Sequence, residues 1–542
     1  MQKYCAADAL AALSILGRAI ACATTLISCV AVSAAGAAEP AETRSLSELR
    51  ADLDSRKTTS VELVQALTQR IDAIDKRGPQ LHSIIAINPD AIKQARALDQ
   101  ELRTKGARGP LHGIPVLLKD NIESADPMPT TAGSLALIDN VTQRDAPIVA
   151  NLRAAGAVIL GKANLSEWAN FRSDVSISGW SAVGGLTKNP YVLDRTSCGS
   201  SAGSAVAVAA ALAPVSVGTE TDGSIVCPAA MNGVVGLKPT LGLLSGKYII
   251  PIARSQDTAG PMATSVKDAA LLLAAMVGDT PACDPPSAGC SKSDYTKGLQ
   301  ATALNGKRIG VFRFEADRQR PLSPIYERAL AHLQEAGATL IEVQPPDLDR
   351  MYEAERIVLN SEFKVGINAY LASTPAKVRT RNLTQLIEFN KQTPAELAVF
   401  GQETFEKANA MPPLNDKNYL SALADSKRIA GVEGLSSLLA EHRLDLIVAP
   451  TTGAAWRIDM VNGSRFPGSF SAMPAVAGYP HLTVPMGYLK ELPVGISFIG
   501  APWSEDLLLA AGYAFEQRAK ARVAPKFIAS LEAQEAAFEP HK

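Results

Sequence analysis

Three residues of this chain have the types and spacing that nucleophilic catalysis requires. Ser200 and Ser224 lie 24 positions apart in segments rich in glycine and small residues, and Lys119 follows the apolar run 116–118. A serine hydroxyl becomes a strong nucleophile only when a base accepts its proton. A lysine among apolar neighbours can be that base, because burial disfavours its charged form and lowers its pKa. These residues therefore indicate a serine hydrolase.

Histidine is the usual base of serine hydrolases, but the six histidines here are scattered and none lies in the serine segments. They are His82, His112, His332, His442, His481 and His541, and sequence distance alone does not exclude them. For Lys119 to act near neutral pH its pKa must fall by about 3 units, which is roughly 4 kcal/mol of differential solvation. The apolar residues that precede it favour such a shift.

The turn Thr221-Asp222-Gly223-Ser224 is a candidate oxyanion hole. A tetrahedral intermediate needs backbone N–H groups directed at its oxyanion, and consecutive residues of a tight turn can present several to one point. Gly223 allows the backbone to approach a substrate closely. Because this turn accompanies a second serine segment and a lysine, a catalytic role is favoured over a purely structural one.

Four segments together resemble the amidase signature family. They are 113–121 around the lysine, 198–204 around the first serine, 218–225 around the second, and 236–240 downstream. Near the C-terminus, three further stretches are similar to the family, at 445–451, 478–485 and 492–496. The resemblance extends over about residues 45 to 520.

The resemblance implies a role for each residue of the site. Ser224 would form the acyl-enzyme, Lys119 would be the general base, and Ser200 would relay the proton between them. The family has a cis peptide bond before the bridging serine, which implies one between Gly199 and Ser200. The N–H groups of the turn 221–224 would form the oxyanion hole. No cofactor is expected, and no cysteine or histidine cluster has metal-ligand spacing.

The fold that the resemblance implies is α/β, with a single large domain in which helices cover both faces of a mixed central β-sheet. Capping boxes that begin at Ser45 and Thr59 predict N-terminal helices within about residues 45–105. Other elements are expected as strands at 113–118, 157–160 and 308–312, and as helices at 203–212 and over much of 350–440. In this family the last of these segments shapes the substrate pocket.

Residues beside Ser224 point to a substrate class. Glu220 is the acidic residue after Gly-Thr, Asp222 replaces a glycine of the family pattern, and Val226 stands where an arginine is frequent. This variant is similar to bacterial peptide amidases, which convert peptide C-terminal amides to carboxylates and ammonia. A charged Asp222 would favour a carboxamide over a carboxylate terminus, because like charges repel in a low dielectric. Asp222 could equally serve only to cap a turn.

Other functions remain open on the sequence alone. The same catalytic set would suit a general aliphatic or aryl amidase, or the glutamine-hydrolysing part of a transfer-RNA amidotransferase, a cytoplasmic enzyme that a cleaved leader would exclude. Residues 199–203 also match Gly-x-Ser-x-Gly, as in an α/β-hydrolase-type esterase with Ser201 as nucleophile, although 189–196 resemble a loop and not the required strand. A non-catalytic periplasmic binding protein is a further alternative, against which the intact catalytic set argues.

Composition restricts the partners. The chain has 53 basic and 54 acidic residues and no block of lysine and arginine, so nucleic-acid binding is not expected. The expected partner is a small-molecule or peptide amide substrate. The chain is expected to be a monomer or a homodimer.

The N-terminus has the pattern of a secretory signal peptide. Lys3 and Arg18 precede an apolar segment at 19–33, and small residues at 35–38 offer a cleavage site. The apolar segment has 15 residues, fewer than the roughly 20 that a membrane span needs. We therefore expect removal of residues 1–38, a catalytic domain over 39–542, and an exported protein, periplasmic or secreted.

The seven cysteines fall into three groups. Three lie in the leader, at Cys5, Cys22 and Cys29. Cys283 and Cys290 flank a proline-rich loop and could close it as a disulfide in an oxidising compartment. Cys198 and Cys227, close to the two serines, are interpreted as small buried residues and not as reactive thiols.

Overall fold

The centre of the fold is a mixed β-sheet formed by eleven strands of the described residues. In the computed structural model these residues are 44–278, 294–313, 321–461 and 466–532. In spatial order the strands are β1 (Ile84–Ile87), β3 (Val158–Ala163), β2 (Pro115–Lys119), β6 (Val215–Glu220), β8 (Thr258–Ala263), β7 (Val235–Lys238), β12 (His481–Leu489), β13 (Leu492–Ile499), β11 (Leu446–Pro450), β9 (Arg308–Val311) and β10 (Thr339–Glu342). A separate ribbon pairs β4 (Trp180–Ser181) with β5 (Gly185–Leu186).

Two parallel groups of strands are joined by an antiparallel centre. Strands β3, β2 and β6 are parallel to one another, and so are β11, β9 and β10. Between them β8, β7, β12 and β13 pair antiparallel, and β1 pairs antiparallel with β3 at one edge. The first parallel group carries Lys119 at the end of β2.

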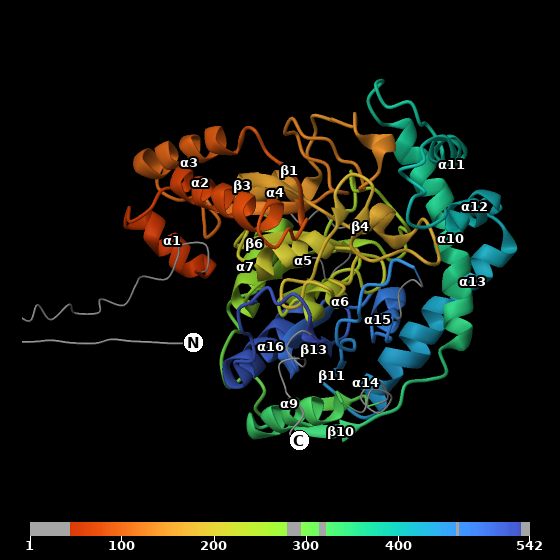
Figure 1. The fold of residues 1–542 in the computed structure, drawn as a ribbon. Coiled ribbons are helices and arrows are strands. Elements are labelled where there is room, and N and C mark those ends of the chain that lie inside the picture. Colours follow the sequence, from red (N-terminus) through yellow and green to blue (C-terminus); the bar gives the residue numbers. More distant parts are fainter. Residues whose placement is uncertain (1–43, 279–293, 314–320, 462–465, 533–542) are drawn as a thin grey trace, which may run out of the picture. The chain divides into compact units, whose positions relative to one another are not determined.

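Helices lie on both faces of this sheet (Figure 1). They are α1 (Leu46–Asp54), α2 (Ser60–Arg70), α3 (Ala91–Lys105), α4 (Pro147–Ala154), α5 (Ala202–Ala209), α6 (Val226–Met231), α7 (Val266–Val277), α9 (Ser323–Glu335), α10 (Asp349–Ala372), α11 (Leu383–Gln392), α12 (Glu403–Ala410), α13 (Lys417–Lys427), α14 (Ser437–Glu441), α15 (Ala472–Ala477) and α16 (Glu505–Ala519). Short π-helical and 3-10 turns lie at Ile71–Lys76, Arg428–Ser436, Leu135–Leu137 and Glu167–Asn170.

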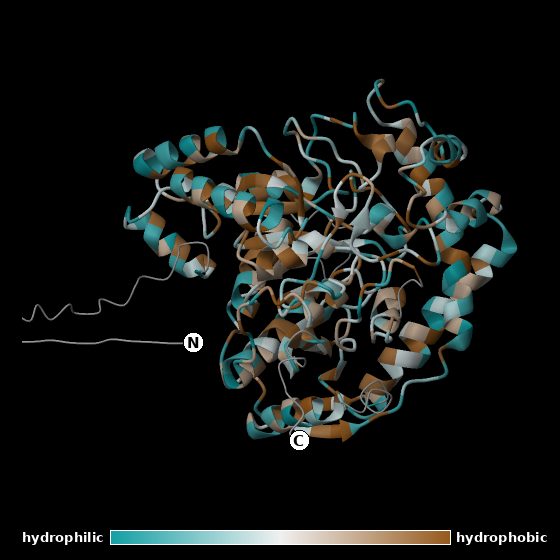
Figure 2. Cartoon of the chain, viewed as in Figure 1, coloured by the Kyte–Doolittle hydropathy of each residue, from teal (hydrophilic) through white to brown (hydrophobic). Residues whose placement is uncertain are grey.

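Alternation of side chains along the strands builds a separate apolar core on each face. On β2, Val116 and Leu118 pack in the core with α4, α7 and α16, whereas Leu117 packs on the opposite face with α2, α3 and α5. Because side chains two positions apart share a face, Lys119 lies on the same face as Leu117 and α5. Figure 2 shows hydrophobic residues concentrated in the central strands, while outer helices such as α3 and α13 alternate between the two colours.

The two N-terminal capping boxes predicted from the sequence are both present. Ser45 and Glu48 exchange hydrogen bonds at the start of α1, and Thr59 and Glu62 do so at the start of α2. Each box satisfies backbone N–H groups that have no partner within the helix. These helices pack against the sheet and contribute no residue to the site described below.

Helices α10 to α13 come from the segment predicted to be helical at 350–440 and lie along one side of the fold (Figure 1). Their apolar residues, among them Phe363, Ile367 and Phe405, form a core cluster with Trp168 and Ile252. This cluster connects the helical layer to loops that border the candidate site. No helix in the described ranges is long and apolar enough to cross a membrane.

The fold expected from the family resemblance is confirmed. Residues Pro40–Lys542 form one compact unit around a mixed sheet, and the strands expected at 113–118, 157–160 and 308–312 appear as β2, β3 and β9. Two expectations fall outside the described residues: the signal peptide at 1–38 and the disulfide between Cys283 and Cys290.

Candidate active site

Lys119 is held at the end of β2 by oxygen atoms of two neighbouring segments. Its fully buried Nζ lies 2.7 Å from Ser200 Oγ, 3.1 Å from the Thr219 carbonyl oxygen and 2.9 Å from Thr219 Oγ1. Asn121 donates a hydrogen bond of 2.9 Å to the same Thr219 Oγ1. Thr219 belongs to β6, which pairs in parallel with β2, so the sheet itself brings these groups together.

The environment of Lys119 favours a neutral amine. Burial lowers the pKa of Lys119 from its ordinary value of 10.5 to about 7, and the negative charges of Glu220 and Asp257 oppose this shift. A neutral amine has two N–H groups and one lone pair. If the two Thr219 oxygens accept both N–H groups, the lone pair is directed at the Ser200 hydroxyl. The arrangement can therefore accept a proton from Ser200 near neutral pH.

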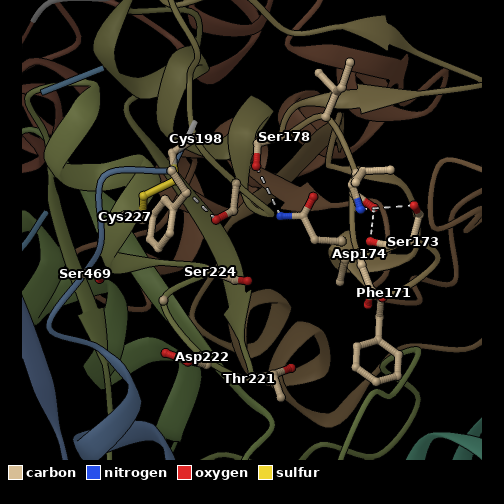
Figure 3. A pocket seen from close by; sticks show the side chains of 18 of the residues that line it. Phe171, Ser173, Asp174, Ser178, Cys198, Thr221, Asp222, Ser224, Cys227 and Ser469 are labelled. Atoms are coloured by element: carbon tan, nitrogen blue, oxygen red, sulfur yellow. Dashed lines mark hydrogen bonds between the residues drawn. A yellow bond between two sulfur atoms is a disulfide. The ribbon is translucent and has the colours of Figure 1, made fainter. Parts of the chain in front are cut away.

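The two serines reach the site from different elements. Ser200 lies just before α5, is fully buried, and follows a cis peptide bond from Gly199, as the resemblance implied. Ser224 lies in the turn between β6 and α6, and its carbonyl oxygen accepts a hydrogen bond of 3.1 Å from the Ser201 N–H. The Ser224 side chain borders an open cavity (Figure 3), whereas Ser200 lies behind the cavity wall, next to Lys119.

Ser201, the nucleophile of the α/β-hydrolase alternative, is not available for catalysis. Its side chain is fully buried, and its Oγ donates to the Thr219 carbonyl at 3.0 Å and accepts the Thr219 N–H at 3.2 Å. The predicted loop at 189–196 is confirmed, because no strand of the main sheet precedes Gly199 directly. Ser201 instead fastens the first serine segment to β6.

The turn that carries Ser224 has the conformation expected of a close backbone approach. Gly223 has φ = 74°, and a Cβ atom there would lie 2.9 Å from Ser471 Oγ, so only glycine fits without strain. Thr221 Oγ1 donates a hydrogen bond of 2.6 Å to Asp257. Burial raises the pKa of Glu220, and hydrogen bonds from backbone N–H groups, that of Gly223 among them, oppose the rise. The predicted four-residue oxyanion hole thus shares one N–H with an internal acceptor.

Two buried acidic side chains near this turn influence each other's ionisation. Burial raises the pKa of Asp222, which lines the cavity, and the charge of Glu220 adds to the rise while a hydrogen bond from Ser471 opposes it. Burial also raises the pKa of Glu355, and the negative charge of Asp222 raises it further. Ionisation of one of these groups therefore disfavours ionisation of the other.

The cavity in front of Ser224 has a volume of about 600 Å³, enough for a drug-sized ligand. Ser224 lies between the Cys198–Cys227 disulfide and Phe171 (Figure 3). Apolar side chains dominate several walls: Phe171, Ile177, Ile252, Leu359, Trp456 and Phe466. Polar lining residues include Asn170, whose Oδ1 is buried and has no hydrogen-bond partner in the described residues. The site can hold an apolar ligand that presents a few polar groups to Ser224 and Asn170.

The wall formed by residues 169–178 is anchored by a buried arginine. Arg172 is fully buried, forms an ion pair of 2.8 Å with Glu167, and donates to the Phe400 carbonyl at 3.2 Å. Its guanidinium carbon also lies 4.1 Å from the centre of the Phe400 ring, a cation–π contact. Within the wall, Asn170 donates to Ser178 at 3.4 Å (Figure 3). One cationic side chain thus fixes a loop whose sequence shows no regular pattern.

Cys198 and Cys227 are buried and are not free thiols, as interpreted from the sequence, with exposed fractions of 4% and 3%. The sequence analysis did not predict that they form a disulfide, which lines the cavity. The bond connects the segment before Ser200 to the segment after Ser224. The sequence contained a signal for it, because each cysteine lies within three positions of a serine predicted to share one site.

The structure places Lys119 in contact with Ser200, and Ser224 next to Ser201 through a backbone hydrogen bond. Sequence reasoning assigned catalytic roles to Lys119, Ser200 and Ser224, and those roles stay predictions. It missed the part of Thr219, although this residue lies within a motif used for the prediction. It also did not predict the cavity wall formed by residues 169–178, or the influence of Glu355 on Asp222. Both come from segments without motifs. Within the described ranges, no group of three or more histidine, cysteine or acidic residues could hold a metal ion.

The chain is similar to known amidases both in sequence and in structure. The amidase family model matches residues 62–509. A probable amidase of Arabidopsis thaliana is 39% identical over 497 residues, which cover 89% of this chain and 91% of that protein. The crystal structure of the peptide amidase from Stenotrophomonas maltophilia aligns with a TM-score of 0.85 and 50% identity, over 89% of this chain and 98% of that one.

A relative with a different role is also similar over most of its length. It is a component of the glutamyl-tRNA(Gln) amidotransferase of Pseudomonas syringae, 33% identical over 87% of this chain and 96% of that protein. The similarity to the peptide amidase structure is higher, at 50% identity.

Proposed function

The chain belongs to the amidase family and is a serine amidohydrolase, and from that premise we propose that it removes the C-terminal amide of peptides with Ser224 as nucleophile. In this proposal Lys119 is the general base, Ser200 relays protons, and the products are a peptide carboxylate and ammonia. The observation that carries it is the 2.7 Å contact between Ser200 Oγ and a fully buried Lys119 Nζ, beside a cavity bordered by Ser224.

The proposed cycle begins with neutral Lys119. Its lone pair accepts the proton of Ser200, which in turn accepts the proton of Ser224 as the Ser224 oxygen attacks the amide carbon. Backbone N–H groups of the turn 221–224 stabilise the oxyanion. The C–N bond then breaks, and protonated Lys119 returns the proton through Ser200 to the departing nitrogen. Water releases the acyl group by the same relay and regenerates Ser224 and neutral Lys119.

The surroundings of Ser224 support a peptide amide as substrate. The cavity combines apolar walls with the unpartnered Asn170 Oδ1, which can accept an N–H of a peptide or a carboxamide. Asp222 lines the cavity, and in its ionised form it would repel a free C-terminal carboxylate but not a neutral carboxamide. The peptide amidase that is 51% identical was crystallised with the competitive inhibitor chymostatin, which is consistent with a peptide-binding cavity in that protein.

Two neighbouring functions share the same chemistry. A general aliphatic or aryl amidase would use the same residues and differ only in the acyl group that it accepts. A component of a transfer-RNA amidotransferase would act on glutamine, and the 33% identity to such a protein is the observation in its favour. The higher identity to peptide amidase and the acidic Asp222 favour the peptide substrate.

We further propose that residues 1–38 are a cleaved leader and that the mature protein is exported. The basic residues, apolar segment and small residues of this stretch support the proposal. A disulfide at Cys198–Cys227 is also consistent with an oxidising compartment. N-terminal sequencing of the protein recovered from the periplasm or medium tests it, and an intact Met1 in the cytoplasm would contradict it.

The test of the proposed reaction is ammonia release by the purified protein from three substrates: a C-terminally amidated apolar dipeptide, propionamide and free glutamine. Fast release from the dipeptide amide supports the proposal, whereas release only from propionamide or only from glutamine points to one of the alternatives. Ser224→Ala should abolish release, and the matched control Ser201→Ala should retain it in the folded fraction. The reverse result would reject Ser224 as the nucleophile.

A further inference from the structure

Glu220 is a buried carboxylate that contacts the nucleophile turn but has no step in the proposed cycle. It is the last residue of β6, and its side chain is 1% exposed. Its neighbour in the strand, Thr219, holds Lys119 through two oxygen atoms. Glu220 therefore lies between the residue that positions the base and the turn that carries Ser224.

One oxygen of Glu220 closes this turn. Its Oε2 accepts the N–H of Ile225 at 2.7 Å and the N–H of Val226 at 3.0 Å. These are the two residues after Ser224, at the start of α6, where N–H groups have no partner within the helix. The carboxylate thus ties residues on the far side of Ser224 back to the strand that precedes it. This tie holds the turn together with the Ser201–Ser224 backbone hydrogen bond and the Cys198–Cys227 disulfide, since no regular element spans residues 221–225.

The negative charge of Glu220 acts on two buried lysines, Lys238 and Lys119. Burial lowers the pKa of Lys238 to about 8, and Glu220 is the strongest of the charges that oppose this shift. For Lys119, Glu220 is likewise the strongest charge that opposes burial. Other charged or titratable groups that face these residues are Asp222 in the turn, Asp257 before β8, His481 on β12 and Glu505 at the start of α16.

We propose that Glu220 is a positioning residue with two separable effects: its two hydrogen bonds set the place of Ser224, and its charge, next in the chain to Thr219, acts on the Lys119 amine that Thr219 holds. The inference rests on the proposed roles of Lys119 and Ser224. It predicts that the geometric effect depends on the length of the side chain and the electrostatic effect on its charge. Substitutions that change one property at a time can therefore separate the two.

Three variants make the separation. Glu220→Gln keeps an oxygen acceptor and removes the charge, so the acid limb of the kcat/KM profile should move by about one pH unit to lower pH, because protonated Lys119 loses a stabilising neighbour. Glu220→Asp keeps the charge but is one methylene shorter, so kcat/KM should fall about 10- to 100-fold with the acid limb little changed. Glu220→Ala should show both effects.

The matched control is Asp268→Asn. Asp268 is another buried carboxylate, which accepts the Leu46 N–H at 3.1 Å in a part of the fold away from the site. It should lose stability with no change in the acid limb. Thermal unfolding of each variant separates misfolding from catalysis, and if Glu220→Gln does not fold, the rate and acid limb of Glu220→Asp still decide.

Labelling of Ser224 by a fluorophosphonate distinguishes failure of the proposed nucleophile from failure of the proposed role of Glu220. No labelling of Ser224 in the unmodified protein would reject the proposed nucleophile and this inference with it. Normal labelling, combined with an unmoved acid limb in Glu220→Gln or a normal rate in Glu220→Asp, would reject the inference alone. Labelling that slows in Glu220→Asp while the limb stays in place would support it.

Discussion

Two lysines buried on neighbouring strands differ in what surrounds them. Lys119 on β2 and Lys162 on β3 both have no exposed side-chain surface, and burial lowers the pKa of each. In the described residues, the hydrogen bonds of both Nζ atoms go to neutral oxygens: Lys119 contacts the Ser200 hydroxyl and Thr219, whereas Lys162 contacts the Ile122 carbonyl and the Thr130 hydroxyl. Carboxylates oppose the pKa shift of each, Glu220 most strongly for Lys119 and Asp120 for Lys162. Burial makes both lysines easier to deprotonate, but Lys119 contacts a serine of the candidate site and Lys162 does not.

The sheet separates the two lysines onto opposite faces. In the pairing of β2 with β3, Lys162 lies beside Leu118, whose side chain belongs to the core on the α4 and α7 face. Lys119, one position later, lies on the face of α5, the helix that follows Ser200. The alternation of side chains along the strands therefore separates a candidate catalytic base from a buried lysine that contacts no serine of the site.

The largest expected effect comes from removal of the Lys119 amine. Lys119→Met fills the same space without a base, so kcat for a dipeptide amide should fall by about 1,000-fold or more at every pH. The measurement is steady-state ammonia release by protein whose fold has been checked by circular dichroism. Turnover within tenfold of the unmodified enzyme would show that Lys119 is not the general base. Lys119 would then have no catalytic role that distinguishes it from Lys162.

The matching substitution on the other strand should act on stability. Lys162→Met removes the hydrogen bonds to the Ile122 carbonyl and the Thr130 hydroxyl, and takes a positive charge from the surroundings of the buried Asp120. The free energy of unfolding should fall by about 1 to 3 kcal/mol. Urea unfolding followed by tryptophan fluorescence measures it. Loss of turnover without loss of stability would show that the two lysines are not as different as their contacts indicate.

The disulfide affects the Lys119 face alone, because it joins the segments that carry Ser200 and Ser224. It spans 29 positions, for which chain entropy gives about 3 to 4 kcal/mol of stabilisation. The double variant Cys198→Ala/Cys227→Ala should lose about that much unfolding free energy and several-fold in kcat. Adding a reductant to the unmodified enzyme should have the same effect and leave the double variant unchanged. A reductant effect on the double variant would place the sensitive group elsewhere.

The smallest effect is the pH dependence that distinguishes the two lysines in the unmodified enzyme. With a pKa of about 7 for Lys119, the neutral fraction falls tenfold for each pH unit below 7, so kcat/KM should decline on the acid side with that midpoint. Lys162→Met should keep the same midpoint, because Lys162 takes no part in proton transfer. A midpoint that shifts in Lys162→Met would show that Lys162 influences the titration of Lys119 across the sheet.

Much of the candidate site could be predicted because its residues lie in short contiguous segments. Lys119, Ser200 and Ser224 each sit in a motif whose residue types have a chemical reason, and the cis bond at Gly199 followed from the same resemblance. The contacts of Thr219 could not be read in this way, because they depend on the pairing of β2 with β6. Periodicity placed the strands, but gave no information about which strands are neighbours.

The cavity walls were least predictable. Asn170 and Phe171 belong to an irregular loop held by Arg172, and Leu359 comes from α10. Side chains of such segments show no local period, because their neighbours are far away in the sequence. The pairing of Cys198 with Cys227 is a different case, because both cysteines lie beside the serine motifs and the sequence analysis did not use that proximity.

The amino-acid sequence alone was sufficient to assign the class of chemistry, the family fold and the three residues expected to carry the reaction, since these are properties of local residue types and motifs. Folding settled the rest: that Lys119 and not Lys162 meets a serine, that Ser201 is locked to β6 while Ser224 borders the cavity, and that Asp222 lies at its edge. These outcomes depend on strand register and on contacts between distant segments. Burial and hydrogen bonding arise only when such segments pack together.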